Sequence, residues 1–420
     1  MPKPIKIIKV KSKKESRFEK KEAKRTDDLY KGLDKTAEIA MYYGFVPFRE
    51  NLAVNKEDIA KMKKSLEEVT TSKNLWREYS ICPESKIAIL RAYTEKNMIS
   101  MPQPVCLYFE HPICEHLTKS HSGIDKSIEL EILGTTKSIA EAILIQTSIE
   151  ILKEAGWQDV IVELNSVGDK DSVARFIKEF VNYCRKNIND LHAPCRQALK
   201  RDAFEILLCE DEKCKEIMSR APKSISFLTE SSRTHFKEVL EYLEMLNIPY
   251  RINDKLIGCR SFATQTVFEI KDNSEGGDKN KPFAIGARYN GLAKRIGFRK
   301  ELPAIGATLS FKWNEKNKIS RCSKITKPKI YFIQLGFEAK LKSLRVIEIL
   351  RQAKVPTYQA LSRDKMISQI SMVESMQIPY AIIMGQKEAM EDSVIVREME
   401  TREQETVSIA ELPGYLRKIK

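Results

Sequence analysis

KLIGCRSFATQTVFEI, residues 255–270, opens the stretch from Lys255 to Trp313 that decides the fold. Three runs rich in apolar and β-branched residues follow one another in it: QTVFEI at 265–270, FAIGARYNGL at 283–292 and PAIGATLSF at 303–311. A loop of Gly, Asp, Asn and Lys residues separates the first two runs, which is typical of adjacent antiparallel strands. Gly286 and Gly306 lie inside the later runs. A glycine there indicates that the backbone passes close to a ligand or to a neighbouring strand.

The composition is that of a soluble globular protein with two or three domains. The chain has 420 residues, of which 42% are hydrophobic and 31% are charged, so it can bury a sizeable core. No apolar run approaches the roughly 18 residues needed to span a bilayer, and the basic N-terminus lacks the apolar region of a secretory signal. The nine cysteines are an odd number and do not form a disulfide scaffold in a chain of this length. We therefore expect reduced thiols, no membrane association and a cytoplasmic protein.

The charge balance favours a polyanionic partner. The formal net charge is +14 and the pI is about 9.1. Each phosphate that Lys or Arg neutralises releases counterions, so such a balance is typical of proteins that contact nucleic acids. Residues 1–26 are dominated by Lys and Arg and are predicted to form a basic tail, either a polyanion-binding arm or a solvated tail.

The cysteine and histidine spacings predict no metal site. Cys209 and Cys214 are separated by four residues, without a second Cys/His pair nearby at zinc spacing, and a solvated turn is favoured there. His111, His116 and His121 lie close together in the sequence, but their spacing fits no standard metal site.

Hydrophobic periodicity organises the rest of the chain. An amphipathic helix is predicted from residue 27 to 43, followed by a strand at 45–49, a helix at 136–155 and a strand at 159–165. Residues 170–250 are predicted to be mostly helical, and 314–328 form a polar linker. Beyond it strands are predicted at 330–335, 356–359, 380–384 and 394–398, and helices at 338–353, 363–376 and 408–419. This alternation predicts a small α/β domain with a mixed sheet.

Several segments resemble histidyl-tRNA synthetase, a class II aminoacyl-tRNA synthetase. The similar segments are LNSVGD at 164–169, TVFE at 266–269, ARYNGL at 287–292, PAIG at 303–306, IPYAIIMG at 378–385 and VIVR at 394–397. The resemblance implies an α/β (α+β) fold with an antiparallel class II core at 27–320, a helical insertion at about 170–250 and an anticodon-binding-like α/β domain at 328–420. It also implies a homodimer, although Asn51 stands where the family has a proline.

The resemblance assigns amino-acid recognition to three residues that this chain keeps. CPES at 82–85 is similar to the family's Arg-Pro-Glu-Gly-Thr segment, whose glutamate binds the substrate ammonium; Glu84 stands at this position. The simpler alternative is that Glu84 stabilises a helix N-terminus. Glu131 stands at the position that recognises the imidazole, and Tyr289 is expected in the same pocket. Ser127 replaces a glutamine that helps to hold the amino acid.

The family's nucleotide-binding arginines are replaced. Ile113, Gly258 and Trp313 stand at the three positions, and none of these residues has a cationic donor for the phosphates of ATP. Glu115 and Arg260 remain as candidates for the nucleotide pocket. Arg260 follows Gly258 by two residues, which along a strand would keep the same face and shift the side chain by about 6.6 Å.

Three hypotheses for the function result. The favoured one is a synthetase-like protein that lacks aminoacylation and acts in tRNA binding or regulation, because removing a single comparable donor already costs about 10²–10³ in rate. The second is an active histidine–tRNA ligase that uses ATP with Mg²⁺ and converts ATP, L-histidine and tRNA to histidyl-tRNA, AMP and pyrophosphate. The third is a regulatory subunit of another enzyme, like the synthetase-like subunit of ATP phosphoribosyltransferase. The expected partner is tRNA, with histidine as a further ligand, and no cofactor is predicted under the favoured hypothesis.

Overall fold

The computed structural model describes residues 33–49, 57–58, 60, 83–110, 126–258, 262–275, 281–312, 328–359 and 363–418. The predicted basic tail at 1–26, Asn51 and the histidines at positions 111, 116 and 121 lie outside these ranges. Among the helices in these ranges, none combines the length and the apolar character that a membrane crossing requires.

An eight-stranded sheet forms the centre of the molecule, with the strand order β1-β2-β3-β8-β7-β6-β4-β5. In that order the strands are β1 (Val46–Pro47), β2 (Val105–Phe109), β3 (Lys126–Leu133), β8 (Ala304–Phe311), β7 (Ala284–Arg288), β6 (Thr264–Asp272), β4 (Val160–Gly168) and β5 (Tyr250–Ile252). The two edge strands pair in parallel with their neighbours, and all pairings between them are antiparallel. The predicted antiparallel class II core is therefore confirmed.

The three apolar runs of the deciding stretch become β6, β7 and β8. Val267 pairs with Ala287, which in turn pairs with Gly306. Both glycines make room for a side chain of the adjacent strand, as predicted. A Cβ at Gly286 would overlap with the ring of Phe268, and a Cβ at Gly306 would overlap with the carboxylate of Glu131.

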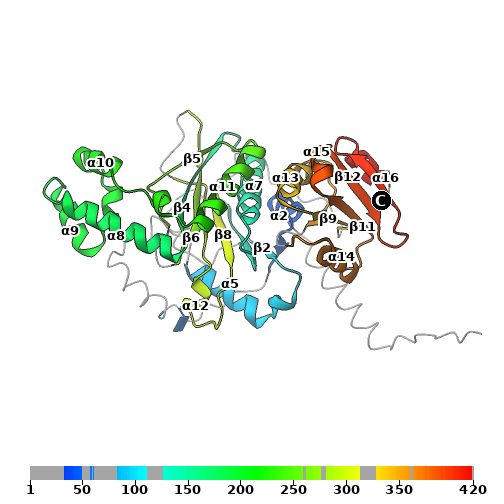
Figure 1. The fold of residues 1–420 in the computed structure, drawn as a ribbon, viewed down its shortest axis with the longest axis horizontal. Coiled ribbons are helices and arrows are strands. Elements are labelled where there is room, and N and C mark those ends of the chain that lie inside the picture. The colour runs from blue at the N-terminus through cyan, green and yellow to red at the C-terminus, as the bar shows by residue number, and fades with distance from the viewer. Residues whose placement is uncertain are drawn as a thin grey trace, which may run out of the picture.

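Three helices cover one face of this sheet: α2 (Lys35–Tyr42), α7 (Ile139–Glu154) and α11 (Glu230–Met245) (Figure 1). Leu130, Ala307 and Phe268 point into the core that these helices share with the sheet. Because successive side chains of a strand point to opposite faces, the neighbours of Leu130 on β3 lie on the other face. There α5 (Pro83–Glu95) packs against the β2 end of the sheet.

The helices between β4 and α11 form an insertion lobe with a core of its own. Its elements are α8 (Lys170–Lys186), α9 (Ala193–Arg201), η2 (Ala203–Leu208), α10 (Glu212–Ser219) and η3 (Ser224–Phe227). Figure 1 shows α8, α9 and α10 at one end of the molecule. The lobe is shorter than the predicted 170–250, because Phe236, Val239 and Leu243 of α11 pack into the main core with α7.

The C-terminal domain contains a second sheet in the order β10-β9-β11-β12-β13. The strands are β9 (Ile330–Gln334), β10 (Thr357–Gln359), β11 (Tyr380–Met384), β12 (Ser393–Glu398) and β13 (Gln404–Ser408), and the helices are α13 (Phe337–Gln352), α14 (Met366–Ser375), α15 (Gln386–Met390) and α16 (Leu412–Lys418). β9, β10 and β11 are parallel and the last two strands antiparallel, which confirms the predicted mixed sheet. The helix predicted from Ser408 begins only at Leu412, because Ser408 pairs with Ser393 at the end of β13.

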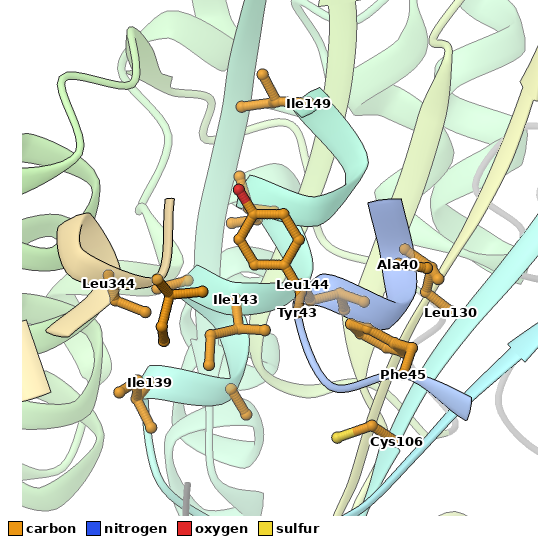
Figure 2. Packing of buried hydrophobic residues seen from close by; sticks show 14 of the residues in the cluster. Ala40, Tyr43, Phe45, Cys106, Leu130, Ile139, Ile143, Leu144, Ile149 and Leu344 are labelled. Atoms are coloured by element: carbon orange, nitrogen blue, oxygen red, sulfur yellow. The ribbon is translucent and has the colours of Figure 1, made fainter. Parts of the chain in front are cut away.

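The C-terminal domain docks on α2 and α7. Tyr43 donates its hydroxyl hydrogen bond to Glu348 of α13. Arg351 of the same helix bridges the two domains, with Nη2 2.8 Å from Glu150 Oε2 and 2.6 Å from Glu348 Oε1. Figure 2 shows Tyr43 and Leu344 among the apolar side chains of this junction. The junction thus combines a continuous core with an ion-pair network.

A buried ion pair joins β7 to α7. Arg288 and Glu141 both have 0% exposed surface, with Nε–Oε1 and Nη2–Oε2 distances of 2.7 and 2.6 Å. Arg288 Nη1 also donates to the carbonyl of Thr135 at 2.7 Å, and His235 Nε2 lies 2.7 Å from Glu141 Oε1. Burial alone would raise the pKa of Glu141, but the charges of Arg288 and His235 lower it to about 2. The carboxylate is therefore ionised at neutral pH.

The substitution Glu141→Gln tests this ion pair. At pH 7 it should lower the free energy of unfolding by about 3–5 kcal/mol, because the guanidinium of Arg288 would stay buried without a counter-charge. The pKa of Glu141 is about 2 in the folded protein against an ordinary 4.5, so its stabilisation is complete above pH 4.5 and is lost as the pH falls toward 2. Denaturant unfolding at several pH values from 7 to 3 measures the difference between variant and parent, which should shrink on acidification.

A matched control is Glu216→Gln, the same chemical change in an exposed pair with Arg220 on α10. It should change the free energy of unfolding by less than about 1 kcal/mol. A destabilisation by Glu141→Gln that is the same at pH 3 as at pH 7 would contradict the role of the ionised carboxylate.

Candidate functional site

Two carboxylates of β3 mark the candidate site. Glu129 and Glu131 are two residues apart on one strand, so their side chains share the face that α2, α7 and α11 do not cover. Glu131 pairs with Leu107 of β2 on one side and with Gly306 of β8 on the other. The missing Cβ of Gly306 leaves the space that the carboxylate of Glu131 fills.

The first turns of α5 bring a lysine between these carboxylates. Lys86 Nζ donates to Glu129 Oε1 at 2.5 Å and also to Glu131 Oε1. Ser85 Oγ donates to the second oxygen of Glu129. One ammonium group thus serves two carboxylates.

Tyr289 completes the network from the end of β7. Its hydroxyl donates to Glu131 Oε2, and its ring centroid lies 5.7 Å from Lys86 Nζ. Lys86, Glu131 and Tyr289 all have 0% exposed surface, and Glu129 has 1%. Each oxygen of Glu131 therefore accepts a hydrogen bond from the protein itself, and neither is in contact with solvent.

The charges of this network depend on its burial. Burial raises the pKa of Glu131 to about 8, although the ammonium of Lys86 acts in the opposite direction. Burial alone would lower the pKa of Lys86, but the carboxylates of Glu129 and Glu131 raise it above its ordinary value. Burial also raises the pKa of Tyr289, so its hydroxyl remains a neutral donor.

A second lysine on this face of the sheet is paired in the same way. Lys271 Nζ of β6 lies 2.9 Å from Glu163 of β4 and 2.8 Å from Glu269 of β6. Lys86 and Lys271 thus each contact two carboxylates, and their positive charge is already neutralised within the sheet.

The structure brings together two of the predicted amino-acid site residues, Glu131 and Tyr289. Glu84 is half-buried in the first turn of α5, where its charge favours the helix N-terminus. Ser127, which replaces the family's glutamine, lies on the same face, with its Oγ 3.1 Å from Ser310 Oγ.

Of the three positions where the family has an arginine, only Gly258 lies within the described residues. Its φ of +59° is in the left-handed region, and a Cβ there would lie 2.7 Å from Val267 Cγ1. A long side chain at this position would be strained and would collide with β6. Ile113, Glu115, Arg260 and Trp313 lie outside the described residues.

Lys86 is the site residue that the sequence reasoning missed. The resemblance placed Glu84 and Ser85 on the family's Arg-Pro-Glu-Gly-Thr segment, so Lys86 stands at its threonine. A second signal was the position of a lysine directly before the apolar run IAIL at 87–90. A charged residue beside such a run is buried only when it is paired.

Comparisons with known proteins agree with this architecture. A family model described as an anticodon binding domain matches residues 329–419. The histidine–tRNA ligase of Lysinibacillus sphaericus is 27% identical over 349 residues, covering 81% of this chain and 82% of that protein. The ligase of Bacillus velezensis is 28% identical over 350 residues, with the same coverage.

The fold is shared with a solved structure, that of apo S. aureus histidyl-tRNA synthetase. The TM-score is 0.50 at 21% sequence identity, and the alignment covers 99% of each chain. The matched domain, the curated relatives and this shared fold together show that the chain is a histidyl-tRNA synthetase-like class II protein.

Proposed function

We propose that this protein binds tRNA and does not charge it with histidine. The observation that carries the proposal is the ammonium of Lys86, buried between Glu129 and Glu131. It occupies the position where the resemblance places recognition of the amino acid.

Histidine would have to compete with the protein's own side chains. The resemblance assigns the imidazole to Glu131, whose two oxygens accept hydrogen bonds from Lys86 and Tyr289. Reaching Glu131 would require Lys86 to withdraw from a site without solvent contact. Removing one partner of a buried charge pair costs about 3–5 kcal/mol, which would offset much of the binding free energy of a small amino acid.

Binding and activation of ATP depend on electrostatic interactions. Phosphoryl chemistry on ATP depends on cations that are positioned in advance against its charge. Gly258 stands at one arginine position in a backbone conformation that disfavours any side chain. The lysines of this face, Lys86 and Lys271, are each held by two carboxylates. Neither Gly258 nor these two lysines therefore offers a free cation to the triphosphate of ATP.

The C-terminal domain and the charge of the chain support binding of tRNA. The anticodon-binding domain model matches almost the whole C-terminal domain, and the curated relatives are histidine–tRNA ligases. The formal net charge of +14 suits a polyanionic partner.

The first prediction concerns histidine binding. Lys86→Thr installs the family's residue and frees Glu131, so the variant should bind histidine at least about tenfold more tightly than the parent, a difference of about 1.4 kcal/mol. Isothermal titration calorimetry measures both affinities. Lys271→Thr is the matched control, since it removes a lysine from Glu163 and Glu269 on the same face and leaves Glu131 occupied. Equal histidine affinity of the parent and Lys86→Thr would show that Lys86 does not block the pocket.

The second prediction concerns adenylate formation. The parent protein, supplied with histidine, ATP and Mg²⁺, should exchange labelled pyrophosphate into ATP no faster than a reaction without histidine. The S. aureus synthetase, assayed in parallel, is the positive control. Exchange by the parent at a rate comparable with that control would establish the rival hypothesis of an active histidine–tRNA ligase.

The third prediction concerns tRNA. Filter binding of bulk tRNA across a salt series should give an affinity that falls linearly with salt on logarithmic axes, with a slope of about −0.7 to −0.9 for each phosphate contact. A 20-fold excess of inorganic pyrophosphate at constant ionic strength is the control for simple anion competition. An affinity that does not respond to salt would contradict phosphate contact and with it the proposed RNA partner.

A further inference from the structure

Four metal-binding side chains converge in the insertion lobe. Ligand atoms of His192, Cys195 and Cys209 all lie within 4.8 Å of one another. Cys214 lies beside this group of three, with its Sγ 3.6 Å from Cys195 Sγ. His192 is the N-cap of α9, Cys195 lies in the first turn of α9, Cys209 follows η2, and Cys214 lies in the first turn of α10. These side chains thus come from three separate elements, α9, the end of η2 and α10.

The distance between two of the sulfurs suits a tetrahedral ion. With zinc–sulfur bonds of about 2.3 Å, two thiolates of a tetrahedral site lie about 3.8 Å apart. The 3.6 Å between Cys195 and Cys214 is close to that value. Three cysteines and one histidine are also a known ligand set of structural zinc sites, in which the protein fills all four positions.

The local backbone offers donors at two of the four positions. Cys195 and Cys214 are each the third residue of their helices, near the end where backbone N–H groups lack intrahelical partners. The backbone N–H of His192 donates to Cys214 Sγ at 3.2 Å. Such N–H donors around a ligating sulfur orient it and offset its charge.

The expected solvated turn at Cys209 and Cys214 is wrong for Cys214. Its side chain has 0% exposed surface and Cys195 has 4%, so both thiols are within the lobe's core. A disulfide between Cys195 and Cys214 would not explain why Cys209 and His192 lie beside these two thiols. All four described thiols of this lobe, including Cys184 of α8, are free in the structure.

We propose that His192, Cys195, Cys209 and Cys214 bind one structural zinc ion. The ion would join α9, η2 and α10, which are short helices around a small core of their own. Binding would release the thiol protons to solvent as the three sulfurs become thiolates. With four protein ligands the site has no open position for a substrate, so its role is to fix the lobe.

The test is the zinc content of the full-length protein, purified under reducing conditions without chelator and measured by mass spectrometry of the metal. About one zinc ion per chain is expected from the four-ligand set. His192→Ala is the cleanest variant, since His192 is exposed and makes no side-chain capping bond. Loss of a ligand should weaken zinc by at least about 100-fold in a chelator competition, since changes beyond the ligands already cost 10–100-fold.

Two further variants separate ligation from folding. His192→Cys supplies a replacement ligand and should retain zinc, whereas Cys184→Ala changes a buried cysteine of the same lobe outside the cluster and should retain it as well. Cobalt substitution gives a second measurement, because the sulfur-to-cobalt charge-transfer band should weaken in Cys214→Ser and persist in Cys184→Ala.

Three outcomes would overturn the zinc site. The first is a parent protein without stoichiometric zinc after exposure to zinc under reducing conditions. The second is equal zinc affinity of His192→Ala and the parent. The third is a Cys195–Cys214 disulfide in peptide maps of the unreduced protein, which would identify the cluster as a redox pair.

Discussion

The buried ammonium of Lys86 is the interaction on which the open face of the central sheet depends. Glu129 and Glu131 are both removed from water, and two neighbouring carboxylates cannot both ionise there without a nearby cation. Lys86 supplies that cation from α5, and Ser85 and Tyr289 satisfy the outer oxygens. The counter-charge of the two carboxylates is thus the Lys86 side chain and not a ligand.

The same sheet carries a second charge network on its covered face, and β7 links the two. Arg288 and Tyr289 are adjacent, yet Arg288 extends toward Glu141 of α7 and Tyr289 toward Glu131 of β3. Each network pairs its own cations with its own carboxylates: Arg288 faces Glu141, and Lys86 faces Glu129 and Glu131. The two networks share no side chain.

Local patterns predicted only part of the strands. The apolar runs at 265–270, 283–292 and 303–311 correctly indicated β6, β7 and β8, and Gly306 correctly indicated a close neighbour. Four strands, β2, β3, β5 and β13, were not predicted; in β13 only Val407 is buried, so its apolar alternation is weak. The partners of Lys86 lie 43 and 45 residues away, and Cys195 and Cys214 are 19 residues apart, so only the folded chain brings them together.

The position of α7 separates the contacts that hold the C-terminal domain from the network of Lys86. Glu141, near the N-terminal end of α7, contacts Arg288 of β7. Glu150, near its C-terminal end, contacts Arg351 of the C-terminal domain. Both contacts lie on the covered side of the sheet. Lys86 lies on the opposite side of the sheet, so its network and the docking of the C-terminal domain involve different residues. A substitution of Lys86 therefore leaves the contacts of the C-terminal domain in place.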